Sequence, residues 1–311
     1  MLHHLFQSID TVFCTNAATD GLRKEPISTK KLGQGDTAWS NKKKLMGWEL
    51  NTKEHHLRLT PKRDLKVRAA LDTIPSEACQ VSLRKWWHLL CILRSITPSL
   101  SGAQGMSKRL QNKLQQARGR QVQMSPAFQD ELSAWRQLVQ ELAARPTHLR
   151  ELDTFLPTWE GSTDASRSGM GVVCQYPEGQ WFVWCSPFYK ATQSRLVTDT
   201  NPTRDMTIKN LELATLLSQV ILFTPKMDTL AHIYRAMYNT ATQGCSNCGS
   251  VRSEKLVGPI LRDLALLTQT HKIYSSVQRI SGTDNKMADA ASRLTHITDK
   301  MFLCYFSLTF P

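Results

Sequence analysis

The sequence predicts an α/β protein in which a mixed sheet flanked by helices follows a mainly helical region. Three observations support this prediction. Residues 60–145 carry apolar side chains at helical spacing, and short apolar segments separated by turn residues follow Pro157. From residue 210 onward, helical and extended patterns alternate, which is typical of a sheet whose later strands are joined by crossovers. At 311 residues, the chain is long enough for two domains with separate cores.

The helical region is expected to begin with a small hairpin. Apolar and polar residues alternate in 45–50 and in 56–59, on either side of a turn-like segment. Pro61 then opens a basic helix that runs to about residue 74. Its apolar side is expected to contain Leu65, Ala69 and Leu71.

Two further helices are expected before residue 150. Ser82 is a good N-cap for a helix to about residue 96, and the segment 97–105 breaks it. Ser125 followed by Pro126 starts the next helix, which Pro146 ends. The apolar residues at helical spacing are Leu83, Trp86, Trp87, Leu90 and Leu93 in the first helix and Phe128, Leu132, Trp135, Leu138, Val139 and Leu142 in the second. Such stripes are more typical of a packed core than of a platform for a ligand.

The second half of the chain predicts the mixed sheet. Pro177–Gly179 is a turn between the second and third strands of a meander. The expected strands are 159–164, 169–175, 181–186, 232–238 and 273–280, and the expected helices are 210–223, 251–268 and 285–294. The first three strands follow one another directly, whereas the last two each follow a helix, so antiparallel and parallel pairs share one sheet.

Three carboxylates stand out in this half. Asp164 ends the first strand and precedes Gly169 and Gly171, which we expect to shape a tight turn beside it. Glu212 is a charged residue inside an apolar helix, and Asp289 lies near the start of the last helix. Each alone has a structural explanation in a turn, a chance position or a helix cap. Together they predict a shared site, because phosphodiester hydrolysis uses carboxylates to hold two Mg²⁺ ions about 3.5–4 Å apart.

The motifs around these carboxylates resemble a known family. The segment D-A-S-R-S-G-M-G begins at Asp164, L-E-L surrounds Glu212, and N-K-M-A-D-A-A-S-R contains Asp289. This order resembles the ribonuclease H domain of retrotransposon polyproteins. Upstream, 45–48 and 85–90 resemble the thumb and connection that follow the polymerase palm of such reverse transcriptases.

The resemblance implies a reverse-transcriptase fragment with a ribonuclease-H-like domain. Such a domain hydrolyses the RNA of RNA–DNA hybrids by two-metal catalysis, with Mg²⁺ or Mn²⁺ held here by Asp164, Glu212 and Asp289. The implied organisation is an irregular basic remnant of the palm in 1–44, a thumb and connection in 45–150, the ribonuclease-H-like domain in 151–295 and a tail in 296–311.

Two departures from the family pattern predict impaired activity. The paired aspartates of a polymerase palm, an aromatic-x-Asp-Asp turn, occur nowhere in the sequence. In addition, Tyr238 stands where the family's third carboxylate ends the fourth strand. A phenol with a pKa near 10 is a poor Mg²⁺ ligand at neutral pH.

An alternative function is a non-catalytic nucleic-acid-binding module. Residues 1–150 hold 24 Lys and Arg against 12 Asp and Glu, whereas residues 151–311 hold 15 against 14. Such basicity suits a polyanion, although solvated helix faces also explain it. A third possibility is a zinc site at Cys245 and Cys248, for which no second ligand pair follows. No signal peptide or membrane span is recognisable, so an intracellular protein, nuclear or cytoplasmic, is expected.

Overall fold

The computed structural model describes residues 40–45, 47–100, 103–117, 119–149, 159–176, 179–226, 231–237, 254–271 and 273–310. The chain divides into two compact units, Met1–Lys43 and Lys44–Pro311. Almost all of the first unit lies outside the described residues, so the following account concerns the second. No helix among the described residues is long and apolar enough to cross a membrane.

The predicted hairpin is present near the start of the second unit. Its strands are antiparallel, with Trp48 opposite Leu59, and a short later strand pairs with its second strand. The strands of this region are β1 (Lys42–Leu45), β2 (Trp48–Asn51), β3 (His56–Leu59) and β6 (Thr147–His148). A separate pair joins β4 (Gln80–Ser82) to β5 (Gln121–Gln123) in antiparallel register.

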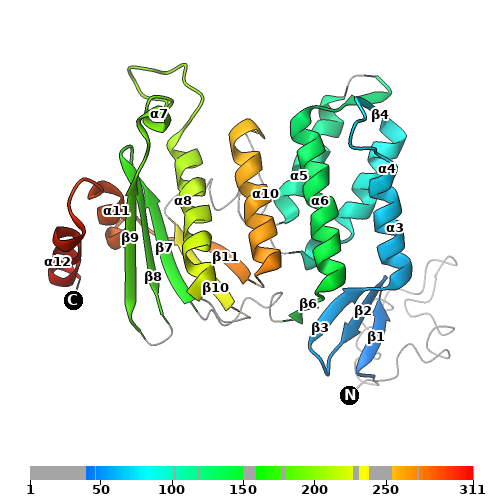
Figure 1. The fold of residues 1–311 in the computed structure, drawn as a ribbon, viewed down its shortest axis with the longest axis horizontal. Helices are drawn as coiled ribbons and strands as arrows, with labels where there is room; N and C mark the ends of the chain where they lie inside the picture. The colour runs from blue at the N-terminus through cyan, green and yellow to red at the C-terminus, as the bar shows by residue number, and fades with distance from the viewer. Residues whose placement is uncertain are drawn as a thin grey trace, which may run out of the picture. The chain divides into compact units, whose positions relative to one another are not determined.

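Four helices, α3, α4, α5 and α6, pack around one apolar core in the described part of this region (Figure 1). They are α3 (Pro61–Asp72), α4 (Leu83–Arg94), α5 (Ala103–Gln116) and α6 (Pro126–Ala144). Ser82 caps α4 as predicted, because its hydroxyl accepts a hydrogen bond from the Lys85 N–H. The indoles of Trp86 and Trp135 are fully buried in this core.

The sequence was misleading at three places in this region. Leu65 is 68% exposed, because α3 buries Val67, Ala70 and Leu71, and Leu65 lies about 200° around the helix from Val67. Trp87 is 53% exposed, so it does not belong to the apolar stripe of α4. The segment 97–105 was expected to be a break. It contains a short 3-10 helix, η1 (Thr97–Ser99), and then the beginning of α5.

The second half forms a sheet with the strand order β11-β10-β7-β8-β9 in the described part of the chain. The pairs β7–β8 and β8–β9 are antiparallel, whereas β10 is parallel to both β7 and β11. The strands are β7 (Trp159–Ala165), β8 (Gly169–Gln175), β9 (Trp181–Pro187), β10 (Ala231–Met237) and β11 (Ile273–Arg279). The predicted fold class is therefore confirmed: a mixed sheet flanked by helices follows a mainly helical region.

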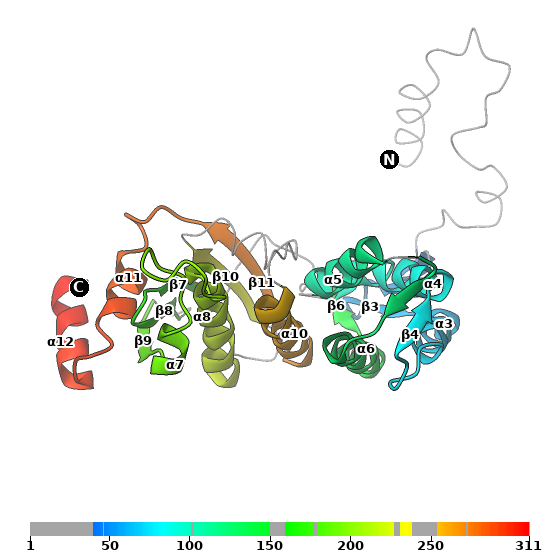
Figure 2. The ribbon, with the colours of Figure 1, turned by 90° about the horizontal axis from the view of Figure 1, so that it is seen from above.

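Helices cover both faces of this sheet, with α8 and α11 on opposite sides (Figure 2). The helical segments are α7 (Lys190–Gln193), α8 (Ile208–Phe223), η3 (Thr224–Lys226), α10 (Glu254–Thr270), α11 (Lys286–Arg293) and α12 (Asp299–Thr309). Helix α12 falls in the segment that was expected to be a tail. Phe302 and Phe306 on α12 pack with Ala291 of α11 in a small apolar cluster.

Helix α10 contributes to two cores. Val257, Leu261 and Leu264 belong to the core between the sheet and α8, whereas Ala265 belongs to the core of the four helices. Because one face of α10 packs on each core, this helix connects them.

Candidate active site

Asp164 lies at the end of β7 and faces α11. In the β7–β8 ladder, Asp164 is opposite Gly171. Side chains alternate between the two faces of a strand, so Asp164 lies on one face and its neighbour Ala165 on the other. Ala165 packs with Leu211 of α8. The Asp164 carboxylate is therefore on the face of the sheet that α11 covers.

Gly171 allows α11 to approach the sheet closely. A Cβ atom at this position would lie 2.3 Å from the Ala288 carbonyl oxygen and 2.4 Å from the Ser292 backbone nitrogen. Only glycine fits there, because both neighbours are backbone atoms that cannot move aside. The expectation that Gly169 and Gly171 shape a turn beside Asp164 was thus wrong: both lie inside β8.

Side-chain hydrogen bonds fix α11 to the end of β7. The Ser292 hydroxyl donates to Asp164 Oδ2 over 2.7 Å, and the Ser166 hydroxyl donates to the Ser292 carbonyl over 2.7 Å. The Asn285 amide, just before α11, donates to the Thr163 carbonyl over 3.1 Å. Because Ser292 is fully buried, its hydrogen bond restricts the orientation of the Asp164 carboxylate.

Asp289 lies on α11 and interacts electrostatically with Asp164. Its carboxylate accepts two hydrogen bonds from Arg293, one residue-turn later, over 2.9 Å from Nε and 2.7 Å from Nη2. Both N–H groups point at the same oxygen, Asp289 Oδ1. The Arg293 charge also acts on Asp164. The site thus combines two carboxylates and one guanidinium.

The pKa of Asp164 is raised above its usual value of 3.8. Burial is the main cause, because a charged carboxylate loses solvation there. The negative charge of Asp289 raises the pKa further, whereas the Ser292 hydrogen bond, the Arg293 charge and the Ala165 N–H lower it. The pKa of Arg293 is raised by its hydrogen bond to Asp289 and by that residue's charge. The electrostatics therefore favour a cation beside the two carboxylates.

Glu212 is not brought into this pair. It lies on α8 and is only 7% exposed. Helix α8 packs against Ala165 and Val172, on the face of the sheet opposite to Asp164. Within the described residues, no three His, Cys, Asp or Glu side chains lie close enough together to hold a metal ion. The predicted convergence of three carboxylates is thus seen for two, Asp164 and Asp289.

The predicted third position lies outside the described residues. Strand β10 ends at Met237, which is opposite Thr163 in β7. Tyr238 follows immediately and belongs to the segment that is not described, as do Cys245 and Cys248. The predictions for these residues stay predictions.

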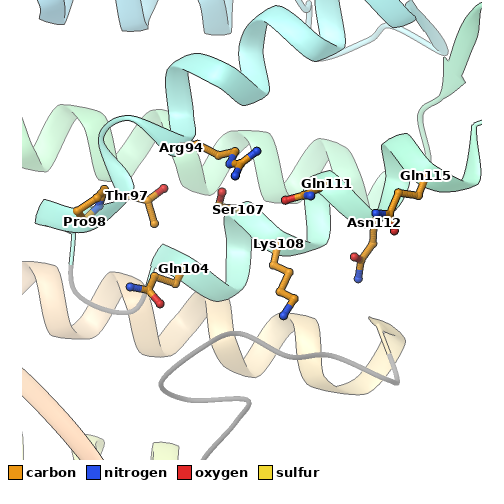
Figure 3. A pocket seen from close by; sticks show the side chains of 9 residues that line it. All are labelled: Arg94, Thr97, Pro98, Gln104, Ser107, Lys108, Gln111, Asn112 and Gln115. Atoms are coloured by element: carbon orange, nitrogen blue, oxygen red, sulfur yellow. The ribbon is translucent and has the colours of Figure 1, made fainter. Parts of the chain in front are cut away.

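A polar groove of about 490 Å³ lies between η1 and α5, in the basic first half of the chain (Figure 3). Arg94, at the end of α4, and Lys108, on α5, supply its positive charge. The other lining residues are Thr97, Pro98, Gln104, Ser107, Gln111, Asn112 and Gln115. No carboxylate and no aromatic ring lines the groove, so its walls offer mainly hydrogen-bonding groups and two cations.

The comparisons with known proteins give similarity at the level of solved structures. No protein-family model matches the sequence, and no curated protein matches it. Ribonuclease H1 from the archaeon Halobacterium salinarum is 14% identical with a TM-score of 0.34, and the match covers 44% of this chain and 96% of that chain. LC11-RNase H1 in complex with an RNA/DNA hybrid is 14% identical with a TM-score of 0.34, covering 43% and 92%. A foamy viral protease-reverse transcriptase in complex with an RNA/DNA hybrid is 12% identical with a TM-score of 0.31, covering 83% of this chain and 31% of that chain.

Sequence reasoning named the carboxylates but not their partners. Ser292 and Arg293 follow Asp289 at spacings of three and four residues, which put all three on one side of a helix. That spacing was a usable signal for the Arg293 pair. The contact of Ser292 with Asp164 joins residues 128 positions apart, and it depends on the close approach of α11 at Gly171.

Proposed function

We propose that residues 151–295 form a ribonuclease-H-like domain that acts on the RNA strand of RNA–DNA hybrids. The observation that carries this proposal is the pairing of Asp164 and Asp289 beneath α11. Their carboxylates come from elements far apart in the sequence, and Ser292 holds one of them in place. Burying two acidic groups together is unfavourable without a cation, so the arrangement is one that a folded protein retains for binding.

The two carboxylates suit a hard divalent cation. Mg²⁺ prefers oxygen ligands and is commonly held by one or two carboxylates, with water and substrate phosphates completing its shell. Asp164 and Asp289 would supply these oxygens. Bound there, Mg²⁺ or Mn²⁺ would activate water and stabilise the leaving oxygen of a phosphodiester. Ser292 would keep Asp164 in its orientation during this chemistry.

Within this proposal, the remaining two positions explain why activity is expected to be weak. Glu212 would be the third carboxylate, but its helix packs on the other face of the sheet. Tyr238 would stand at the fourth position and provide a neutral phenol in place of a carboxylate. A metal held by fewer carboxylates binds less tightly and orients the attacking water less well.

We also propose that the chain derives from a retrotransposon reverse transcriptase. Residues 45–150 would be its thumb and connection, 1–44 a remnant of the palm, and 296–311 a tail that contains α12. The motifs that resemble this family support the origin. Because no palm motif is present in the sequence, polymerisation is not part of the proposed function.

The test is cleavage of a labelled RNA–DNA hybrid by the full chain with Mg²⁺ or Mn²⁺. We expect slow cleavage that Asp164→Asn abolishes and that Tyr238→Asp accelerates at least tenfold. Asp205→Asn is a matched control, because Asp205 is an exposed carboxylate paired with Arg195. Cleavage that survives Asp164→Asn, or none even in Tyr238→Asp, would contradict the proposal.

The groove of Figure 3 favours a second candidate function, non-catalytic binding of nucleic acid. Gln104, Lys108, Gln111 and Gln115 line one side of α5 over about 16 Å of helix. Arg94 and Lys108 would pair with phosphates, while the carboxamides would both donate and accept hydrogen bonds along the strand.

This candidate is tested by binding of the hybrid in EDTA at several salt concentrations. The double variant Arg94→Gln/Lys108→Gln should weaken binding about tenfold or more and reduce the slope of log K against log salt by about 2. The control Lys62→Gln/Lys66→Gln removes the same charge from exposed positions of α3 outside the groove. If both double variants lose affinity equally, only overall charge matters and the groove is not a site.

A further inference from the structure

We propose that Arg293 is an internal counter-ion of the Asp164–Asp289 pair and competes with a divalent cation for it. This inference rests on the proposed function, because it concerns the same two carboxylates. It adds a regulatory element that the family resemblance does not contain: the metal site is occupied by the protein's own cation until a stronger one displaces it.

The geometry of the ion pair supports direct competition. Arg293 Nε and Nη2 both donate to Asp289 Oδ1, over 2.9 and 2.7 Å. A carboxylate oxygen has two lone-pair directions, and two N–H donors use both of them. While the pair is formed, Oδ1 has no lone pair left to offer a metal ion. Since Arg293 also acts electrostatically on Asp164, its charge further disfavours a second cation beside that carboxylate.

The exposure of the two partners makes the exchange possible. The Arg293 side chain is 66% exposed and that of Asp289 is 44% exposed. Ion pairs this accessible to water are weak, so the guanidinium can rotate into solvent at little cost. By contrast, the Ser292 hydroxyl that holds Asp164 is fully buried. The site therefore combines a fixed carboxylate, Asp164, with a carboxylate whose partner can leave.

The experiment measures Mn²⁺ binding to the full chain by calorimetry, without nucleic acid. Arg293→Gln should bind Mn²⁺ about two- to fivefold more tightly than the wild type, as expected for removal of a solvent-exposed ion pair. The matched control is Arg195→Gln. Arg195 also forms an exposed pair, with its Nη2 2.6 Å from Asp205 Oδ2, and its loss changes the net charge equally.

The outcomes separate this inference from the proposed function. Asp164→Asn should weaken Mn²⁺ binding more than tenfold; if it does not, the metal site itself is refuted. If Asp164→Asn weakens binding but Arg293→Gln leaves it unchanged or weaker, only the competition is refuted. An equal gain in Arg293→Gln and Arg195→Gln would trace the effect to net charge and would likewise overturn the inference. Thermal unfolding of each variant verifies that the fold is intact.

Discussion

At the scale of single residues, the most informative group is the Asp164 carboxylate. It is partly buried, lies beside a second carboxylate, and is held by the hydroxyl of Ser292. These features make it unfavourable for stability in the absence of a cation, which is common for groups that a protein keeps for binding.

Asp164→Asn should raise the unfolding temperature at neutral pH in metal-free buffer. The folded-state pKa of Asp164 is raised, so the folded protein holds the proton more tightly than the unfolded chain does. The wild type therefore loses stability as pH rises from the ordinary carboxyl value of 3.8 through the raised pKa, and the asparagine variant does not. Asparagine Oδ1 can still accept the Ser292 hydrogen bond. Melting curves from pH 3 to 8 should show the difference growing over this window, and a difference already present below it would contradict the explanation.

At the scale of elements, the contact between α11 and β8 positions the site. Gly171→Ala should destabilise the protein by about 1–3 kcal/mol, because the new methyl group would collide with backbone atoms of α11. It should also weaken Mn²⁺ binding, since α11 carries Asp289. Chemical denaturation and metal titration provide the two measurements.

A suitable comparison is Gly179→Ala. Gly179 has open space around its Cβ position but a φ of 85°, so the cost there is backbone strain alone. This variant should lose stability and leave Mn²⁺ affinity unchanged. A loss of Mn²⁺ affinity of the same size in both variants would show that α11 is not specifically involved.

The buried ion pair between Arg109 of α5 and Glu131 of α6 is the next element-scale feature. Their side chains are 5% and 1% exposed. Replacing one partner, as in Arg109→Met, should cost about 3–5 kcal/mol because a charge is left buried. The double variant Arg109→Met/Glu131→Leu should lie closer to the wild type. Urea denaturation of the single and double variants measures the coupling, and additive losses would contradict it.

Most elements could be predicted from the sequence, since their patterns are local. The strands β7, β8 and β9 and the helices α6 and α8 follow from alternation, caps and apolar spacing. The start of α5 was missed because Pro98 and the glycines near it favour a break, whereas Ala103 and Met106 are fully buried in the core. Leu65 was assigned to the wrong face because α3 is short and mostly polar.

The site could be predicted only in part for the same reason. Asp164 and Asp289 carry local motif signals, and these two residues are the ones brought together. Glu212 has the same kind of signal, but only the tertiary fold determines which face of the sheet its helix covers. Ser292 could not be chosen as the partner of Asp164 without knowing where α11 meets the sheet.

At the scale of the whole molecule, α10 determines how the second unit responds to stress. Its residues belong both to the core of the four helices and to the core under the sheet. Arg109 from α5 lies directly against Gly258 of α10, so a side chain there would displace the guanidinium. Arg145 donates to the Gln269 carbonyl over 2.6 Å at the other end of α10.

Unfolding of the second unit should therefore be one transition for both cores. Fluorotryptophan NMR can follow Trp135 in one core and Trp159 in the other, and the two midpoints should coincide in urea. Ala265→Asp places an unpaired charge at a fully buried position of α10 and should separate the midpoints. Midpoints that already differ in the wild type would refute the coupling.

The double role of α10 has a practical consequence for dissecting this chain. A fragment cut just before Trp159 retains the whole sheet, yet it leaves Ala265 and its neighbour Leu266 facing water instead of the four-helix core. It also removes Arg145, the donor to Gln269. Such a piece would tend to self-associate through this newly bared apolar strip. Weak solubility of the excised domain would then reflect the cut rather than any defect in the catalytic half.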